Sequence, residues 1–219
     1  MIEAVIFDID GILINSEPFW KIAEQKCFLT VGLELTDELC KQTTGMDGIG
    51  TITYWYHHKP WKDLSFAEIK KRIENDVIDQ IERNGTACIG VDKILDLFIA
   101  KQFKRAVASS SPLHMIETVL KKLNITQFFH VLQSSETEEA GKPNPAVYIA
   151  AAKRLNVKPD QCLAFEDSIN GLKSAKTAGM KVVVVPDPHL KGDARFHEAD
   201  LLIESLDKFS EDHLNLLNL

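Results

Sequence analysis

Four short apolar runs rich in β-branched residues recur along the chain, and the segments between them have the polarity pattern of amphipathic helices. The runs are "AVIFD" at residues 4–8, "RAVASS" at 105–110, "CLAFED" at 162–167 and "VVVVPD" at 182–187. Short, continuous apolar runs are typical of strands that are buried on both faces in a parallel sheet. The alternation of such strands with helices therefore predicts an α/β fold built on a doubly wound parallel sheet.

Two of the intervening segments carry clear helix signals. In "SPLHMIETVLKKL", residues 111–123, Ser111 suits the N-cap and Pro112 the first helical position. In "SINGLKSAKTAGM", residues 168–180, apolar residues recur on one face and Gly179 is expected to end the helix. We expect both helices to cover the sheet.

Residues 15–86 have a different character, because they lack strand-like runs and contain several amphipathic segments. Examples are "EPFWKIAEQKCFLTVG" and "FAEIKKRIENDVIDQIERNG". This pattern predicts a helical insertion after the first strand. The expected organisation is a core domain of residues 1–14 and 87–219 and a helical domain of residues 15–86.

The composition limits the classes of partner. Among 219 residues there are 25 Lys and Arg against 32 Asp and Glu, a net charge of −7, which argues against nucleic acid or an anionic membrane as a partner. No apolar run approaches the roughly 18 residues of a membrane span, and the opening "MIEAVIFD" does not resemble a signal peptide. The four cysteines form no CxxC pair, so we expect free thiols. We expect a cytoplasmic monomer.

Polar side chains follow the strand-like runs where the runs end. They are Asp8 and Asp10 after the first run, Ser109, Ser110 and Ser111 after the second, and Glu166 and Asp167 after the third. Lys142 lies in the loop "AGKPNP" between the second and third runs. Because ligands of open parallel sheets bind at the carboxyl ends of the strands, we expect these groups to converge there.

This set of side chains suits phosphoryl transfer. Carboxylates could hold a hard cation such as Mg²⁺, which would also relieve the repulsion between Asp8 and Asp10. The lysine, the serine hydroxyls and the N–H groups at a helix N-terminus could bind a phosphate. Of two aspartates separated by one residue, one could attack phosphorus while the other transfers a proton.

Four segments, in order, resemble the four motifs of the haloacid dehalogenase superfamily. They are "DIDGILINSEP", "VASSSP", "GKPNP" and "FEDSINGLKSAKTAGM". The similarity runs over nearly the whole chain. Within the superfamily, "NSEPFW", "WYHHKPW" and "SSSPLHM" are similar to a subgroup of bacterial hexitol and 2-deoxyglucose-6-phosphate phosphatases. The resemblance implies a Rossmann-like core with a helical cap inserted after the first motif.

The resemblance also implies roles for individual residues. Asp8 would be the nucleophile that forms an aspartyl-phosphate, and Asp10 would be the general acid and base. Mg²⁺ would be held by the carboxylate of Asp8, the backbone carbonyl of Asp10 and Asp167, with direct or water-mediated help from Glu166. The phosphate would be bound by the residues of the substrate-binding set, which are Asp8, Ile9, Asp10, Ser109, Ser110 and Lys142. Glu17 could reach a hydroxyl of the leaving group, although an acid at a helix start is an equal alternative.

Our functional prediction is a Mg²⁺-dependent phosphatase of small sugar or polyol phosphates, with three alternatives. A dehalogenase would not need Asp10, because its leaving group takes no proton. A β-phosphoglucomutase resembles this chain in all four motifs, but it typically carries a histidine where this chain has Trp20, and its relatives carry an arginine in the loop where this chain has Asp47. A non-catalytic sensor of phosphometabolites could lose Asp8 or Asp10, and both are present.

Two features of the insertion have open interpretations. Trp20 is expected either in the core of the helical domain or on the wall of the substrate pocket. His57 and His58 are adjacent, and adjacent histidines rarely face one metal ion, so we expect them on the surface.

Overall fold

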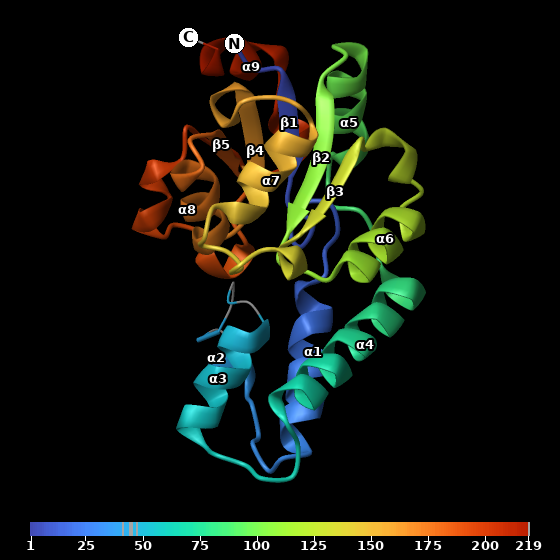
Figure 1. Ribbon diagram of the computed structural model, residues 1–219, viewed down its shortest axis with the longest axis vertical. Coiled ribbons are helices and arrows are strands. Elements are labelled where there is room, and N and C mark those ends of the chain that lie inside the picture. The colour runs from blue at the N-terminus through green and yellow to red at the C-terminus, as the bar shows by residue number, and fades with distance from the viewer. Residues whose placement is uncertain (41, 44–45, 47, 219) are drawn as a thin grey trace.

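The computed structural model describes residues 1–40, 42–43, 46 and 48–218, and a six-stranded sheet forms its centre (Figure 1). The strands are β1 (Ala4–Phe7), β2 (Lys104–Ser109), β3 (Val131–Ser134), β4 (Cys162–Glu166), β5 (Lys181–Val184) and β6 (Leu201–Leu202). Their order in space is β3-β2-β1-β4-β5-β6, and every neighbouring pair is parallel. This confirms the predicted doubly wound parallel sheet, with β1 in its middle.

Helices cover both faces of the sheet. The α-helices are α1 (Glu17–Leu29), α2 (Asp37–Cys40), α3 (Gly48–His58), α4 (Phe66–Asn84), α5 (Val91–Ala100), α6 (Leu113–Lys122), α7 (Ala146–Arg154), α8 (Ile169–Thr177) and α9 (Glu211–Leu217). Short 3₁₀ helices are η1 (Thr126–Phe128), η2 (Ser135–Thr137), η3 (Pro159–Gln161), η4 (Pro188–Leu190), η5 (Ala194–Glu198) and η6 (Leu206–Lys208). Within the described residues, no helix combines the length and the apolar character that crossing a bilayer would require.

Alternate apolar residues of the strands β1, β2, β4 and β5 belong to two separate apolar clusters. In β1, Val5 and Phe7 pack with α5, α6 and α9, whereas Ala4 and Ile6 pack with α7 and α8. Phe7 stacks on Phe165 of β4, with ring centroids 5.1 Å apart. Because side chains of a strand point alternately to opposite faces, an uninterrupted apolar run serves two cores at once.

The helices α1 to α4 lie together beyond the carboxyl edge of the sheet (Figure 1). Helix α4 begins with a capping box between Ser65 and Glu68. Its buried residues recur every four positions, at Ile69, Ile73, Val77 and Ile81. Each buried aliphatic side chain stabilises the fold by roughly 1.5–3 kcal/mol, so this stripe holds α4 in place.

The chain leaves and re-enters the sheet region through two adjacent segments. Ile14 and Ala87 form an antiparallel bridge, and the N–H of Cys88 donates to the carbonyl of Leu13 at 3.1 Å. The junctions predicted between residues 14 and 15 and between residues 86 and 87 fall at this bridge. The division into two domains at these positions remains a prediction.

Candidate active site

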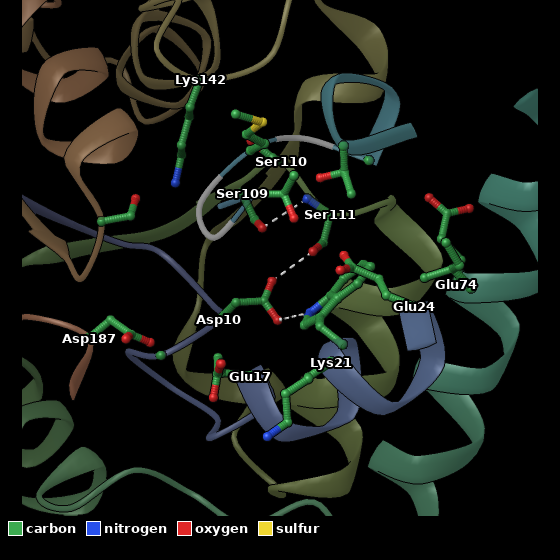
Figure 2. Close-up of a pocket in the computed structure, with 18 of the residues that line it drawn as sticks. Asp10, Glu17, Lys21, Glu24, Glu74, Ser109, Ser110, Ser111, Lys142 and Asp187 are labelled. Carbon is green, nitrogen blue, oxygen red and sulfur yellow. Dashed lines mark hydrogen bonds between the residues drawn. The ribbon is translucent and has the colours of Figure 1, made fainter. Parts of the chain in front are cut away.

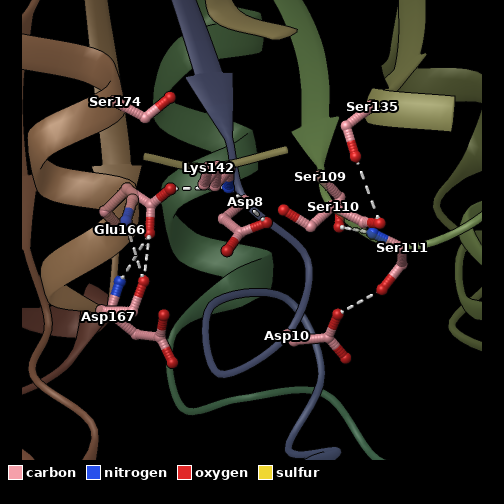
Figure 3. A network of polar contacts seen from close by, with 12 residues as sticks. Asp8, Asp10, Ser109, Ser110, Ser111, Ser135, Lys142, Glu166, Asp167 and Ser174 are labelled. Atoms are coloured by element: carbon pink, nitrogen blue, oxygen red, sulfur yellow. Dashed lines mark hydrogen bonds and ion pairs between the residues drawn. The ribbon is translucent and has the colours of Figure 1, made fainter. Parts of the chain in front are cut away.

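The turn after β1 brings the first motif against the end of β4. The N–H of Asp8 donates to the carbonyl of Phe165 at 3.0 Å, so Asp8 continues the line of β1. Gly11 follows with a φ of +74°, and a Cβ atom at this position would lie 2.1 Å from Oδ2 of Asp167. Only glycine combines this backbone conformation with such a close approach. The first and fourth motifs are therefore in direct contact, and Figure 3 shows Asp8 near Glu166 and Asp167.

Lys142 joins two buried carboxylates. Its Nζ atom lies 2.9 Å from Oδ1 of Asp8 and 2.6 Å from Oε1 of Glu166, and the side chains of all three residues are almost inaccessible to solvent. The same Glu166 oxygen accepts a hydrogen bond from the hydroxyl of Tyr148. Burial opposes the positive charge, but the carboxylates of Asp8 and Glu166 raise the pKa of Lys142 above its usual value. Lys142 therefore stays cationic beside Asp8.

The carboxylates beside Lys142 form an acidic cluster. Asp8, Glu166 and Asp167 each offer an oxygen atom, and these atoms all lie within 4.8 Å of one another. Burial raises the pKa of Asp8 to about 7; Lys142 counteracts this effect, and Glu166 and Asp10 add to it. Burial and the neighbouring charge of Asp8 also raise the pKa of Asp167 well above its usual value. Three converging carboxylates, whose negative charges a single lysine offsets only in part, fit a hard divalent cation.

Glu166 and Asp10, two of the predicted metal-binding residues, each accept several hydrogen bonds from protein groups. Glu166 accepts hydrogen bonds from Lys142 and Tyr148, and it is fully buried. A Cβ atom on Gly171, in the first turn of α8, would lie 1.9 Å from its Oε2 atom. The carboxylate of Asp10 lies outside the cluster of three. This position is compatible with the expectation that Asp10 offers its backbone carbonyl to a metal.

Three donors hold the carboxylate of Asp10. The hydroxyl of Ser16 and the indole N–H of Trp20, 3.0 Å away, donate to Oδ1, and the hydroxyl of Ser111 donates to Oδ2 at 2.7 Å. Ser16 and Trp20 belong to the start of the insertion, whereas Ser111 follows β2. Figure 2 shows Asp10 between these two parts of the chain. The side chain is thus oriented from both sides.

The assignment of Ser111 as a helix N-cap is wrong. Helix α6 begins at Leu113 with Pro112 in the N-cap position and no side-chain cap. The hydroxyl of Ser111 instead donates to Asp10, and its N–H donates to the hydroxyl of Ser109 at 3.0 Å. The carbonyl of Ser110 accepts from the hydroxyl of Ser135. The second motif is therefore a bonded turn that faces Asp8 and Asp10.

A cavity of about 200 Å³ lies above these residues, between the sheet edge and the helices of the insertion (Figure 2). Asp8, Asp10, Ser109, Ser110 and Lys142 line it on the sheet side. All the predicted catalytic side chains thus meet in one pocket.

Glu17 and Ile9, the other predicted substrate-binding residues, lie in different surroundings: Glu17 lines the pocket, whereas the side chain of Ile9 is buried in the core. Glu17 and Trp20 line the pocket from α1, and the carboxylate of Glu17 lies 3.4 Å from Nε2 of His189. Ile9 is fully buried, so its side chain belongs to the core and only its backbone could serve a ligand. Asp47 lies outside the described residues.

Sequence reasoning missed several residues that support the site. Tyr148, Ser16 and the donor function of Trp20 had no sequence signal, because each contacts a residue that the chain brings near only by folding. Asp187 also lines the pocket, and its side chain accepts from the N–H of His189 at 2.7 Å. It follows the strand-like run "VVVVP", so the rule that polar residues gather after strands could have found it.

A doubly wound sheet that carries a buried lysine, a buried aspartate and an acidic cluster at one edge has the character of an α/β enzyme. The chain matches the haloacid dehalogenase-like hydrolases over residues 5–185, which include Asp8, Ser109, Lys142 and Asp167. It belongs to that family, as the four motifs predict.

Known relatives cover most of the chain. Hexitol phosphatase B of Escherichia coli strain K12 is 37% identical over 205 residues, which are 93% of this chain and 92% of that protein. A phosphorylated carbohydrates phosphatase of Thermotoga maritima is 30% identical over 182 residues, or 82% of each protein. The crystal structure of CbbY from Rhodobacter sphaeroides in complex with phosphate has a TM-score of 0.90 and 25% identity, and the match covers 100% of both chains.

Proposed function

We propose that this protein is a Mg²⁺-dependent phosphatase that hydrolyses the phosphate monoesters of small sugars or polyols. The observation that carries this proposal is the placement of Asp8. Its buried carboxylate lies at the floor of the pocket beside cationic Lys142, and Asp10 lies on the same pocket wall. The names of the relatives from Escherichia coli and Thermotoga maritima support sugar or polyol phosphates as the substrate class.

The reaction would proceed in two displacements at phosphorus. An oxygen of Asp8 attacks, the bond to the ester oxygen breaks, and Asp10 gives its proton to the departing alkoxide. Water then attacks the resulting aspartyl-phosphate, Asp10 takes the water proton, and Asp8 and inorganic phosphate are released. The donors Ser16, Trp20 and Ser111 hold the Asp10 carboxyl in one orientation through both steps.

The charge on the phosphate would be balanced by the groups around Asp8. Lys142, the hydroxyl of Ser109 and the N–H groups of Ile9 and Ser110 would bind its oxygens. Mg²⁺, held by Asp8, Asp167 and the carbonyl of Asp10 with help from Glu166, would supply electrostatic stabilisation of the charge that develops on phosphorus.

We further propose that residues 15–86 act as a cap. Their helices provide one wall of the pocket, and closing it would exclude water from the aspartyl-phosphate until hydrolysis. We propose that the protein acts as a cytoplasmic monomer, for which light scattering should give a mass near 24.6 kDa.

A mutase activity is less favoured. In place of the histidine typical of β-phosphoglucomutases, Trp20 donates its indole N–H to Asp10 and so occupies the space beside the general acid. An indole N–H only donates a hydrogen bond and cannot exchange a proton with a substrate at neutral pH.

The test is hydrolysis of p-nitrophenyl phosphate and of a set of metabolites, with and without Mg²⁺. The set should include hexose and hexitol phosphates, glycerol phosphates and nucleoside monophosphates. We expect Mg²⁺-dependent release of phosphate, no turnover in Asp8→Asn, and a loss of about 10²–10⁴ in Asp10→Asn. Absence of hydrolysis with Mg²⁺ present would instead favour a phosphometabolite sensor.

A further inference from the structure

The wall of the pocket opposite Asp8 is made by the helices of the insertion. Its polar side chains include three carboxylates, Glu17, Glu24 and Glu74, and the hydroxyls of Thr43 and Thr51. Ile52 and Ile73 are among the apolar residues of this side. The wall thus resembles neither the cationic phosphate side nor a purely apolar pocket.

The described lysines on this wall already have partners. Nζ of Lys21 lies 3.1 Å from Asp37, and Nζ of Lys70 lies 2.5 Å from Glu74. Glu17 likewise lies 3.4 Å from His189. In contrast, half-buried Glu24 forms no hydrogen bond or ion pair with any residue that the structure describes.

The position of Glu24 relates it to the reacting centre. It lies on α1 four residues after Trp20, and neighbours at this spacing share one face of a helix, about 6 Å apart along its axis. Trp20 contacts Asp10, which would protonate the ester oxygen. Figure 2 shows the carboxyl of Glu24 directed from α1 into the pocket, on the side of Asp10 and Ser111. It therefore faces the space for the leaving group, beyond the ester oxygen.

We infer that Glu24 determines substrate specificity by forming a hydrogen bond with a hydroxyl group of the leaving group. This inference rests on the proposed phosphatase activity and deepens it. Glu24 is half-buried and lines the pocket, so its carboxyl can form hydrogen bonds with water or with a ligand that enters there. A polyol or sugar hydroxyl fits, because it both donates and accepts.

The charge at Glu24 supports this choice of ligand. Burial, and next the charge of Glu17, raise the pKa of Glu24 to about 7, so both forms of its carboxyl exist near neutral pH. The carboxylate accepts from a hydroxyl and the acid donates to one. A second phosphate group at this position would add negative charge next to Glu17 and Glu24. The wall therefore favours a neutral, hydroxylated leaving group.

The test compares two substrates in Glu24→Ala and Glu24→Gln. A hexitol phosphate carries distant hydroxyls, whereas p-nitrophenyl phosphate carries none. For Glu24→Ala we expect kcat/KM for the hexitol phosphate to fall at least about tenfold, with p-nitrophenyl phosphate unchanged. Glu24→Gln should lose less, because the amide still donates and accepts. Exposed Glu34, substituted by Ala, is the control and should change neither substrate.

Equal losses on both substrates would overturn the inference, since Glu24 would then act through Trp20 or through folding. Unchanged hexitol phosphate turnover in both Glu24 variants would overturn it as well. Either result leaves the phosphatase proposal intact. If the wild-type protein hydrolyses neither substrate with Mg²⁺, the proposed function itself is wrong and the inference with it. Circular dichroism and melting temperatures show whether each variant is folded. If Glu24→Ala is unfolded, Glu24→Gln carries the test, because glutamine has nearly the same shape as glutamate.

Discussion

The indole nitrogen of Trp20 lies 3.0 Å from Oδ1 of Asp10, so a helix of the insertion directly contacts the proposed proton-transfer residue of the sheet edge. Ser16 donates to the same oxygen, and Ser111 donates to the other. Formation of the site thus requires the insertion and the sheet together. The contribution of this contact can be tested by removing the indole N–H that donates to Asp10.

Trp20→Phe should lower kcat for hydrolysis by about tenfold to a hundredfold, because a hydrogen bond to a charged group contributes roughly 1.5–3 kcal/mol. The aromatic ring remains, so the melting temperature should change little. Steady-state kinetics on p-nitrophenyl phosphate measure the effect. Trp61→Phe is a matched control, because the indole of Trp61 donates at 3.0 Å to the carbonyl of Leu64, within the insertion. Similar kinetics for both variants would contradict a role of Trp20 in orienting Asp10.

Gly11→Ala should abolish activity and weaken Mg²⁺ binding. An added Cβ would lie 2.1 Å from Oδ2 of Asp167 and would clash with it. An alanine would also be strained at the φ of +74° that this position requires. Gly192→Ala separates the steric clash from the backbone strain. Gly192 has a φ of +86°, but an added Cβ there would meet nothing within 4 Å. That control should cost about 1–2 kcal/mol of stability and leave turnover unchanged. Calorimetric titration with Mg²⁺ and kinetics measure both variants; a fully active Gly11→Ala would refute the contact.

Tyr148→Phe should destabilise the fold by about 1–3 kcal/mol, because fully buried Glu166 loses a hydrogen-bond donor. Burial, and next the charge of Glu166, raise the pKa of Tyr148 well above its usual value, so its hydroxyl stays protonated and able to donate. Urea unfolding gives the change in free energy. Tyr54→Phe removes an exposed hydroxyl that donates to Gln42 at 2.7 Å and should have a much smaller effect. Equal effects in the two variants would argue against the buried network.

Glu24→Gln should stabilise the protein at alkaline pH. The pKa of Glu24 rises from 4.5 to about 7 on folding, so the folded state binds the proton more tightly and wild-type stability is lost as pH rises between these values. The neutral amide avoids this loss. The free energy of unfolding of Glu24→Gln minus that of wild type should therefore be about 2–3 kcal/mol larger at pH 8 than at pH 5.

Urea unfolding at the two pH values measures this difference for Glu24→Gln. Glu34→Gln, at an exposed position, is the control and should show no such pH dependence. If Glu24→Gln and wild type kept the same difference in stability at both pH values, Glu24 would not titrate in this range.

Local patterns along the chain determined the centre of the fold. The four apolar runs became β1, β2, β4 and β5, because strands buried on both faces need continuous apolar residues. The edge strands β3 and β6 escaped prediction. β3 contains the polar residues Gln133 and Ser134, and β6 spans only Leu201–Leu202, so neither has the signal of a buried run. The polar residues of β3 are buried but hydrogen-bonded: Nε2 of Gln133 donates to Glu138 at 2.8 Å, and the hydroxyl of Ser134 donates to the carbonyl of Ser111 at 2.7 Å.

The sequence by itself also determined which chemical groups the site contains. Asp8, Asp10, Ser109, Lys142 and Asp167 follow strands or lie in the connecting loop, and a parallel sheet must gather such residues at one edge. Their spacing did not determine how each group is bonded. Ser111 was predicted to cap a helix but donates to Asp10. Trp20 had two interpretations from the sequence, and the structure shows that its indole N–H donates to the same carboxylate. Propensity acts over a few neighbours, whereas these bonds join residues up to 101 positions apart, so only the tertiary structure could decide them.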